Sequence, residues 1–112
     1  MPDVSFQVEM AGDVPVVAAP GDIDITNAAA LRTALLEAAG RGRMFVVDMS
    51  RTQFCDTAGI HALVAAHKRA GDDGSEVRLV VTSATVLRIF EITGFDQVVS
   101  CFTSLDQALA AP

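Results

Sequence analysis

The 112-residue chain contains no tryptophan or tyrosine and only six phenylalanines. Its hydrophobic residues, which make up 51% of the sequence, are mostly Val, Ile, Leu and Ala, so any core must be built from these small aliphatic side chains. Charged residues make up a further 20%, an ordinary balance for a globular protein. At this length we expect a single domain, spanning residues 1–112, that folds without covalent cross-links.

Basic residues are also scarce, because eight Lys and Arg stand against fourteen Asp and Glu and leave a formal net charge of −6. Nucleic-acid binding depends on neutralising phosphates with Lys and Arg, and anionic membrane surfaces attract the same residues. The composition therefore argues against both kinds of partner. A protein with a basic surface is the more natural complement.

The sequence has no long apolar run and no recognisable leader. The opening segment MPDVSFQVEM contains acidic residues and lacks a basic region followed by an apolar stretch, which is the pattern of a signal peptide. Nowhere does an apolar run approach the roughly 18 residues that a membrane-spanning helix needs. We therefore expect a cytoplasmic protein without direct membrane insertion.

Cysteine is nearly absent: Cys55 and Cys101 are the only two, they lie far apart, and no histidine near them gives a metal-binding spacing. The sequence thus predicts neither a metal site nor a cofactor. Two reduced thiols of an intracellular protein are the favoured interpretation. A redox-controlled disulfide is the alternative, and it requires the fold to bring the two Cα atoms within about 7 Å.

The N-terminal part has the period-two pattern of strands. Val4, Phe6, Val8 and Met10 alternate with polar residues, which indicates a strand with one solvated face. A turn at residues 11–13 and a second strand at 14–19 complete a predicted antiparallel hairpin.

From residue 26 onward, helical and strand patterns alternate. Thr26 is predicted to cap a helix whose apolar stripe is Leu31, Ala34, Leu35 and Ala38. Next come a strand at 44–49, a helix at 58–69, a strand at 77–81, a helix capped by Ser83 that ends at Gly94, and a strand at 97–102. A capping box at 104–107 opens a short last helix. The glycine segments 40–43 and 70–75 are interpreted as helix stops.

The element order β-β-α-β-α-β-α-β-α predicts a small mixed α/β sheet, in which an antiparallel N-terminal hairpin is followed by parallel β-α units with right-handed crossovers. In such sheets, ligands bind beyond the carboxyl ends of the parallel strands. The segment expected there is 54–60, which leads directly into the second helix. Topology by itself does not determine activity.

A hydroxyl at the start of that helix has two interpretations. Thr57, or its neighbour Asp56, can simply be the N-cap that satisfies free N–H groups. Alternatively, Thr57 accepts a phosphoryl group, because helix N-termini tolerate added negative charge. A phosphate there would change the surface charge by about −1.5 to −2 while the domain stays folded.

Other polar residues give weaker signals. Asp22 and Asp24 fit either turn formation or contact with a basic partner. Asp48 ends a strand as in phospho-aspartate receivers, but the paired acids and the lysine of such a site are missing. His61 is expected to face solvent or a partner, whereas His67 continues an apolar stripe and is expected to be structural. No activated nucleophile with its base is recognisable, so we do not expect an enzyme.

Four segments together resemble the STAS domain, and more narrowly the bacterial anti-sigma factor antagonists. They are GDID at 21–24, FVVDMS at 45–50, FCDTAGIHAL at 54–63 and LRIFEITGF at 87–95. The most specific of them is the Asp-Thr-x-Gly sequence between a strand and a helix. The resemblance spans nearly the whole chain and follows the predicted element order.

The resemblance implies a switch protein. In that family, the hydroxyl residue after the Asp, here Thr57, is phosphorylated by an anti-sigma factor that is also a serine/threonine kinase, and a PP2C-type phosphatase removes the phosphate. The unmodified antagonist binds the anti-sigma factor and so frees a sigma factor. The implied partner-binding residues are Gly21, Asp22, Ile23, Asp24, Asp56, Thr57, Ala58, Gly59, Ile60 and His61.

The sequence also departs from the family pattern. Many members carry Ser where this chain has Thr57, and a second hydroxyl residue where it has Ala58. Ile60-His61 replaces a Leu-Gly pair. An alternative within the same superfamily is a stand-alone accessory subunit of a lipid-transport ABC transporter. A nucleotide-binding protein is a more distant third, because the chain has no P-loop.

Overall fold

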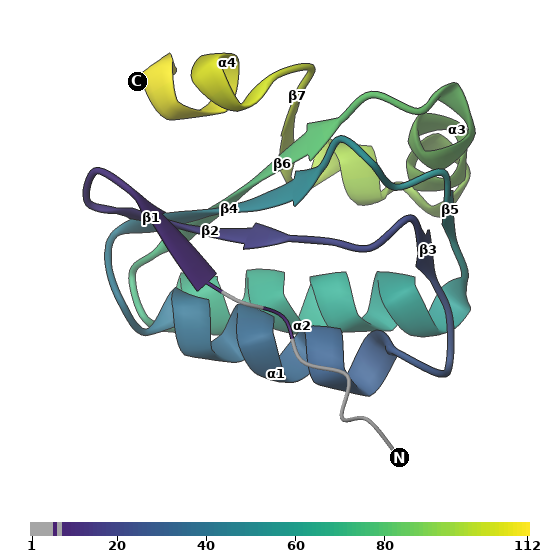
Figure 1. Cartoon of the computed structure of the whole chain (residues 1–112), viewed down its shortest axis with the longest axis horizontal. Coiled ribbons are helices and arrows are strands. Elements are labelled where there is room, and N and C mark those ends of the chain that lie inside the picture. The colour runs from purple at the N-terminus through teal and green to yellow at the C-terminus, as the bar shows by residue number, and fades with distance from the viewer. Residues whose placement is uncertain (1–5, 7) are drawn as a thin grey trace.

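The computed structural model describes Phe6 and residues 8–112, and these contain a five-stranded sheet in the order β1-β2-β4-β6-β7 (Figure 1). Its strands are β1 (Val8–Ala11), β2 (Val14–Ala18), β4 (Met44–Met49), β6 (Glu76–Val81) and β7 (Ser100–Phe102). β1 pairs antiparallel with β2, and every other pairing in this sheet is parallel. The predicted mixed α/β fold with an N-terminal hairpin is therefore confirmed. Val4 of the predicted first strand lies outside the described residues.

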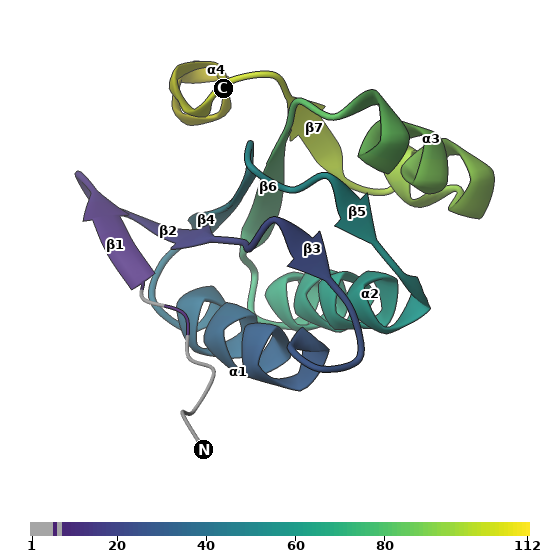
Figure 2. The same ribbon diagram turned by 45° about the vertical axis from the view of Figure 1, so that its right-hand side comes forward.

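Helices cover both faces of the sheet. α1 (Ala28–Ala39) and α2 (Thr57–Asp72) lie on one face, and the short α4 (Leu105–Ala110) lies on the other (Figures 1 and 2). α3 (Ala84–Thr93) stands at the end of the sheet where β6 finishes. The alternation of strand side chains produces two cores: Phe45 and Val47 pack toward α1 and α2, whereas Val46 packs toward α4.

Arg78, in β6, attaches α4 to the sheet. Its side chain is only 5% exposed. One terminal nitrogen, Nη1, donates hydrogen bonds of 2.7 Å to the carbonyls of Ala108 and Ala111, and Nη2 donates to the carbonyl of Pro112 at 3.1 Å. The ring of Phe102 lies 5.8 Å from the guanidinium carbon. Nη2 also donates to Oε1 of Glu76 at 3.2 Å. The charge thus lies against carbonyl oxygens, a carboxylate and an aromatic face, all of which stabilise it.

A second, two-stranded parallel sheet was not predicted from the sequence. It consists of β3 (Asp22–Ile23) and β5 (Phe54–Cys55), in the segments that were expected to be loops (Figure 2). These strands continue the chain beyond the carboxyl ends of β2 and β4. A strand of two residues is too short to produce a periodic sequence pattern, so the pairing of β3 with β5 is visible only in three dimensions.

The prediction that Thr26 caps the first helix is wrong. α1 begins at Ala28 with Asn27 in the cap position. Thr26 instead donates hydrogen bonds from its backbone N–H and its hydroxyl to Oδ1 of Asp24. Asn27 accepts from the backbone N–H of Asp24 and donates to the carbonyl of Asp22. The polar side chains therefore stabilise the loop before α1 rather than the helix start, a competition typical of Asp, Asn and Thr.

Two other boundaries also differ from the prediction. α2 continues through Gly71 to Asp72, three residues beyond the predicted end. The chain turns out of it at Gly74, whose φ is +71°. The predicted strand 97–102 is shorter, because a 3₁₀ turn, η1 (Phe95–Gln97), precedes β7. Phe95 is buried edge-to-face against Phe90, with ring centroids 5.3 Å apart, and this contact draws the chain into the turn.

The other predicted helix caps are present. The hydroxyl oxygen of Ser83 accepts from the N–H of Val86, and that of Ser104 accepts from the N–H of Gln107. Gly94 ends α3 with a φ of +78°, as a C-terminal glycine is expected to do. In the second half of the capping box, Gln107 differs from the prediction, because its side chain accepts from Thr103 rather than from the N-cap residue.

Candidate functional site

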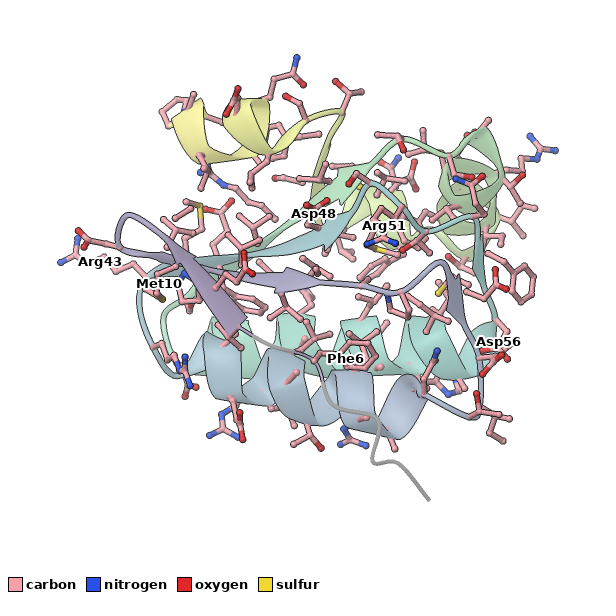
Figure 3. The ribbon with its side chains drawn as sticks, in the orientation of Figure 1. Phe6, Met10, Arg43, Asp48, Arg51 and Asp56 are labelled. Carbon is pink, nitrogen blue, oxygen red and sulfur yellow. The ribbon has the colours of Figure 1, made fainter. Side chains whose placement is uncertain are left out.

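The β3–β5 pair brings the two motifs of the sequence side by side at one end of the molecule. The N–H of Gln53 donates to the carbonyl of Gly21 at 2.7 Å, and the N–H of Asp56 donates to the carbonyl of Ile23 at 3.0 Å. The GDID segment is thus hydrogen-bonded along its length to the residues just before Thr57. Figure 3 shows Asp56 where β5 leads into α2, at the opposite end of the molecule from Arg43.

Asp56 is the N-cap of α2 and Thr57 is its first helical residue. Oδ1 of Asp56 accepts a hydrogen bond from the N–H of Gly59 at 3.1 Å, and this bond fixes the start of the helix. Thr57 is exposed, and no hydrogen bond joins its hydroxyl to another described residue. The two sequence interpretations are therefore divided between neighbours: Asp56 is the cap, and the hydroxyl of Thr57 is free for other chemistry.

Gly59 allows α2 to lie directly on the small sheet. A Cβ atom at this position would come within 2.6 Å of Sγ of Cys55 and of Cγ2 of Ile23. Real Cβ atoms do not approach so closely, so any larger residue would push the helix start away from β3 and β5. The glycine of the Asp-Thr-x-Gly motif is thus explained by close packing directly beneath the exposed threonine.

Two grooves lie at the start of α2, and Thr57 lines one of them. One, of about 520 Å³, lies between the start of α2 and the end of α3 and is lined by Phe54, Cys55, Asp56, Thr57, Ile60, His61, Ile89 and Thr93. The other, of about 390 Å³, lies between α1 and α2 and is lined by Ala28, Ala29, Arg32, Thr33, Ala58, His61 and Ala62. His61 lines both grooves and is exposed. The lining of the first groove combines apolar side chains, such as Ile60 and Ile89, with polar ones beside Thr57.

The predicted partner-binding residues divide into a surface and a support. Gly21, Asp22, Thr57 and His61 are exposed, and Asp24, Asp56 and Ala58 are half-buried. In contrast, Ile23 and Gly59 are buried, and Ile60 is 8% exposed. The first two buried residues lie under the helix start and hold the exposed ones in place. Ile60 additionally lines the larger groove.

The acidic loop between β3 and α1 has a defined electrostatic state. The side chain and the backbone N–H of Thr26 both donate to Asp24 and hold the pKa of its carboxyl below the usual range. Asp24 is therefore ionised at neutral pH. Together with Asp22 and Asp56 it gives this end of the molecule a negative edge, and Ile25, which is 81% exposed, adds an apolar contact beside it.

Both cysteines are free thiols in the structure. Burial, and secondarily the carboxylate of Asp56, raises the pKa of Cys55 to about 12. Burial and then Asp96 raise the pKa of Cys101 as well. Because the thiolate is the form that attacks in disulfide exchange, neither environment favours the redox hypothesis for this pair.

The other residues considered from the sequence have structural surroundings. His67 is half-buried on α2, and Oδ1 of Asp48 accepts from the N–H of Ser50 in the turn after β4. Among Phe6 and residues 8–112, no group of three or more His, Cys, Asp or Glu is arranged to hold a metal ion. The helices formed by these residues are all too short or too polar to cross a membrane.

Sequence reasoning missed the contribution of α3 to the site. Ile89 and Thr93 close the larger groove opposite Thr57, and Phe54, which is 45% exposed, forms its rim. The LRIFEITGF segment was part of the family resemblance, but nothing in it indicated which of its residues face α2.

Curated relatives and solved structures resemble this chain over most of its length. The anti-sigma-B factor antagonist of Bacillus subtilis is 27% identical over 79 residues, covering 70% of this chain and 72% of that protein. The anti-sigma-F factor antagonist RsfB of Mycobacterium tuberculosis is 29% identical over 97 residues, covering 86% of this chain and 79% of that protein.

The crystal structure of an anti-sigma factor antagonist from Mycobacterium paratuberculosis superposes with a TM-score of 0.84 at 27% identity, covering 94% of this chain and 90% of that one. The family model of the STAS domain matches residues 5–108. These residues include both motif segments and every helix and strand described above except the last two residues of α4. The chain is therefore a member of the STAS domain family.

Proposed function

We propose that this protein is an anti-sigma factor antagonist whose surface around Thr57 binds an anti-sigma factor, and that phosphorylation of Thr57 abolishes this binding. The observation that carries the proposal is the exposed Thr57 hydroxyl, which directly follows the Asp56 cap at the start of α2. The relatives named as anti-sigma factor antagonists support the same function.

The position of Thr57 favours modification without unfolding. The hydroxyl is accessible and makes no bond that phosphorylation would break, while the helix start is held separately by Asp56 and by the packing of Gly59. A phosphate at the first helical position is also compatible with the helix dipole. The modification therefore changes the surface rather than the fold.

The surroundings of Thr57 explain how one phosphate prevents binding. It would add about −1.5 to −2 charges next to the carboxylate of Asp56 and beside an apolar groove. A partner that fits the unmodified surface would have to bury this charge against groups chosen for a neutral threonine. Burying an unpaired charge costs several kcal/mol, and a loss of about 3 kcal/mol already weakens binding more than a hundredfold.

The proposed partners are those that the family resemblance implies. The anti-sigma factor is a serine/threonine kinase that phosphorylates Thr57 while it is bound, and a PP2C-type phosphatase restores the binding form. The negative edge formed by Asp22, Asp24 and Asp56 complements a basic surface on the kinase, and such complementarity mainly raises the association rate. The protein itself acts as a switch and not as an enzyme.

The test uses a purified kinase-type anti-sigma factor from the same genome and calorimetric measurement of binding. Thr57→Ala should bind with ATP present as tightly as without it, because no phosphate can be added. Thr57→Glu should bind at least about a hundredfold more weakly. Thr103→Glu provides the matched control, since Thr103 is exposed near α4 on the other face of the sheet and should have no effect.

Equal binding by the Ala and Glu variants at position 57 would contradict the switch. Mass spectrometry of the wild-type protein after incubation with kinase and ATP should place a single phosphate on Thr57. Co-purification of a transporter ATPase in place of a kinase would instead favour the accessory-subunit alternative.

A further inference from the structure

His61 lies on the same face of α2 as Thr57, one helical turn further on. Residues four apart on a helix are neighbours, with Cβ atoms about 5–6 Å apart. Both side chains are exposed and both line the 520 Å³ groove. No hydrogen bond or ion pair joins the His61 ring to another described residue, so the ring is available to a group attached to Thr57.

Apart from the free backbone N–H groups of the helix start, a phosphate on Thr57 would have few other partners. The N–H of Gly59 already donates to Asp56, and the Asp56 carboxylate repels a second anion. From α3 the groove receives only Ile89 and Thr93, which carry no charge, and from β5 it receives Phe54 and the neutral, buried thiol of Cys55.

The cations beside the site are therefore few. From α1, Arg32 lines the smaller groove together with His61. Among the residues that line the two grooves, His61 and Arg32 are the only ones able to carry a positive charge. Of these two, only His61 also lines the groove that contains Thr57.

We propose that His61 is the intramolecular partner of the phosphate: Thr57 and His61, one turn apart at the start of α2, form a phosphate-binding pair. This inference rests on the proposed function only in taking Thr57 as the phosphorylated residue. The imidazolium donates a hydrogen bond to a phosphate oxygen.

The pair makes the modified surface sensitive to pH. The second ionisation of a phosphate and that of an imidazole both fall near pH 6–6.5 in the absence of neighbours. Attraction between them stabilises the dianionic phosphate beside a protonated ring, so the phosphate loses its last proton at lower pH than it would alone.

The test does not depend on any kinase. Phosphothreonine is placed at position 57 during translation by genetic-code expansion, and the ³¹P NMR signal is followed between about pH 5 and pH 8. We expect the midpoint of the phosphate titration in the otherwise wild-type chain to lie about 0.15–0.4 pH units below that of the His61→Gln variant. Removing the phosphate with alkaline phosphatase should shift the ring signals of His61.

Two control variants make the result specific. His67→Gln introduces the same substitution further along the same helix, where the ring is half-buried, and should leave the phosphate midpoint unchanged. The NMR signals of the His67 ring should also stay unchanged when the phosphate is removed. Arg32→Gln tests the other nearby cation and should change the midpoint less than His61→Gln does.

Equal midpoints for the wild-type and His61→Gln chains would overturn the inference, and so would a shift that disappears only in Arg32→Gln. Because the phosphate is built in, the failure of every kinase to modify Thr57 would contradict the proposed function and not the pairing. Conversely, a protein that switches as proposed but shows equal midpoints would lose only the role of His61.

Discussion

At its first turn α2 packs against β3 and β5 so tightly that position 59 has no room for a methyl group, whereas at its last turn Gly71 has no atom within 4 Å of an added Cβ. The first turn is capped by Asp56 and supports an exposed threonine. The last turn is held by a solvent-exposed ion pair between Arg69 and Asp73. The comparison indicates that rigidity in this helix is concentrated where the phosphate would be added.

The largest difference in stability is expected when glycine is replaced by alanine at each end of α2 in turn. Gly59→Ala should lower the free energy of unfolding by about 1–3 kcal/mol, because the new methyl group overlaps Ile23 and Cys55. Gly71→Ala should raise it by up to about 1 kcal/mol, because alanine favours the helix and the space is open. Urea denaturation of both variants measures the difference.

Changes in the free energy of unfolding of equal sign and size in the two variants would remove the contrast between the two ends of α2. The Gly59→Ala variant should also bind the anti-sigma factor more weakly, because the start of α2 is displaced. If it lost stability but kept full affinity, the close packing beneath Thr57 would be irrelevant to recognition.

Alkaline pH should destabilise the region under the first turn. In the folded protein the pKa of Cys55 rises from an ordinary value of 9.0 to about 12, so the stability due to the neutral thiol is complete below pH 9. Between about pH 9 and pH 12 the unfolded chain releases this proton and the folded one retains it, which favours unfolding by at most about 1.4 kcal/mol per pH unit. Denaturation midpoints measured across this range should fall.

Cysteine variants separate the two thiols. Cys55→Ala should reduce the alkaline slope more than Cys101→Ala, whatever each variant does to the stability at pH 7. An unchanged slope in Cys55→Ala would mean that another group controls the alkaline unfolding. The measurement thus tests how strongly the site beneath α2 excludes charge.

The smallest effects concern the local interactions at each helix end. Asp56→Ala removes the half-buried N-cap of α2 and should lower the free energy of unfolding by about 0.5–2 kcal/mol. Arg69→Ala removes an ion pair whose side chains are 54% and 38% exposed, and should cost no more than about 0.5 kcal/mol. Thermal denaturation resolves this order. A larger loss for Arg69→Ala would reverse the comparison between the two ends.

Much of the fold was readable from periodicity, because each of the long elements buries one face. The stripe of Leu31, Ala34 and Leu35 predicted α1, and the alternation in the N-terminal residues predicted the hairpin. The β3–β5 pair was missed because each strand has two residues and its partner is about thirty residues away. The cap of α1 was missed because Asp24, Thr26 and Asn27 form hydrogen bonds with one another in the loop before the helix, and several polar residues in a row can each serve as a cap.

The site was predictable to a similar degree. The local sequence around Thr57 identified a helix start with a hydroxyl, and it left open whether Asp56 or Thr57 is the cap. Only the three-dimensional structure shows that Asp56 is the cap and that the hydroxyl of Thr57 is free. Ile89 and Thr93 reach the site through the tertiary approach of α3 to α2, which leaves no spacing in the sequence to detect.

The attachment of α4 through Arg78 has a consequence for how this protein can vary. The guanidinium holds the helix by carbonyl oxygens, and every amino acid supplies a carbonyl. The residues of α4 that face solvent can therefore be exchanged freely while the helix stays docked. Position 78 has no such freedom: a lysine there would have a single ammonium group in place of the planar fork that reaches four acceptors. The anchor therefore tolerates substitution in α4 but not at Arg78.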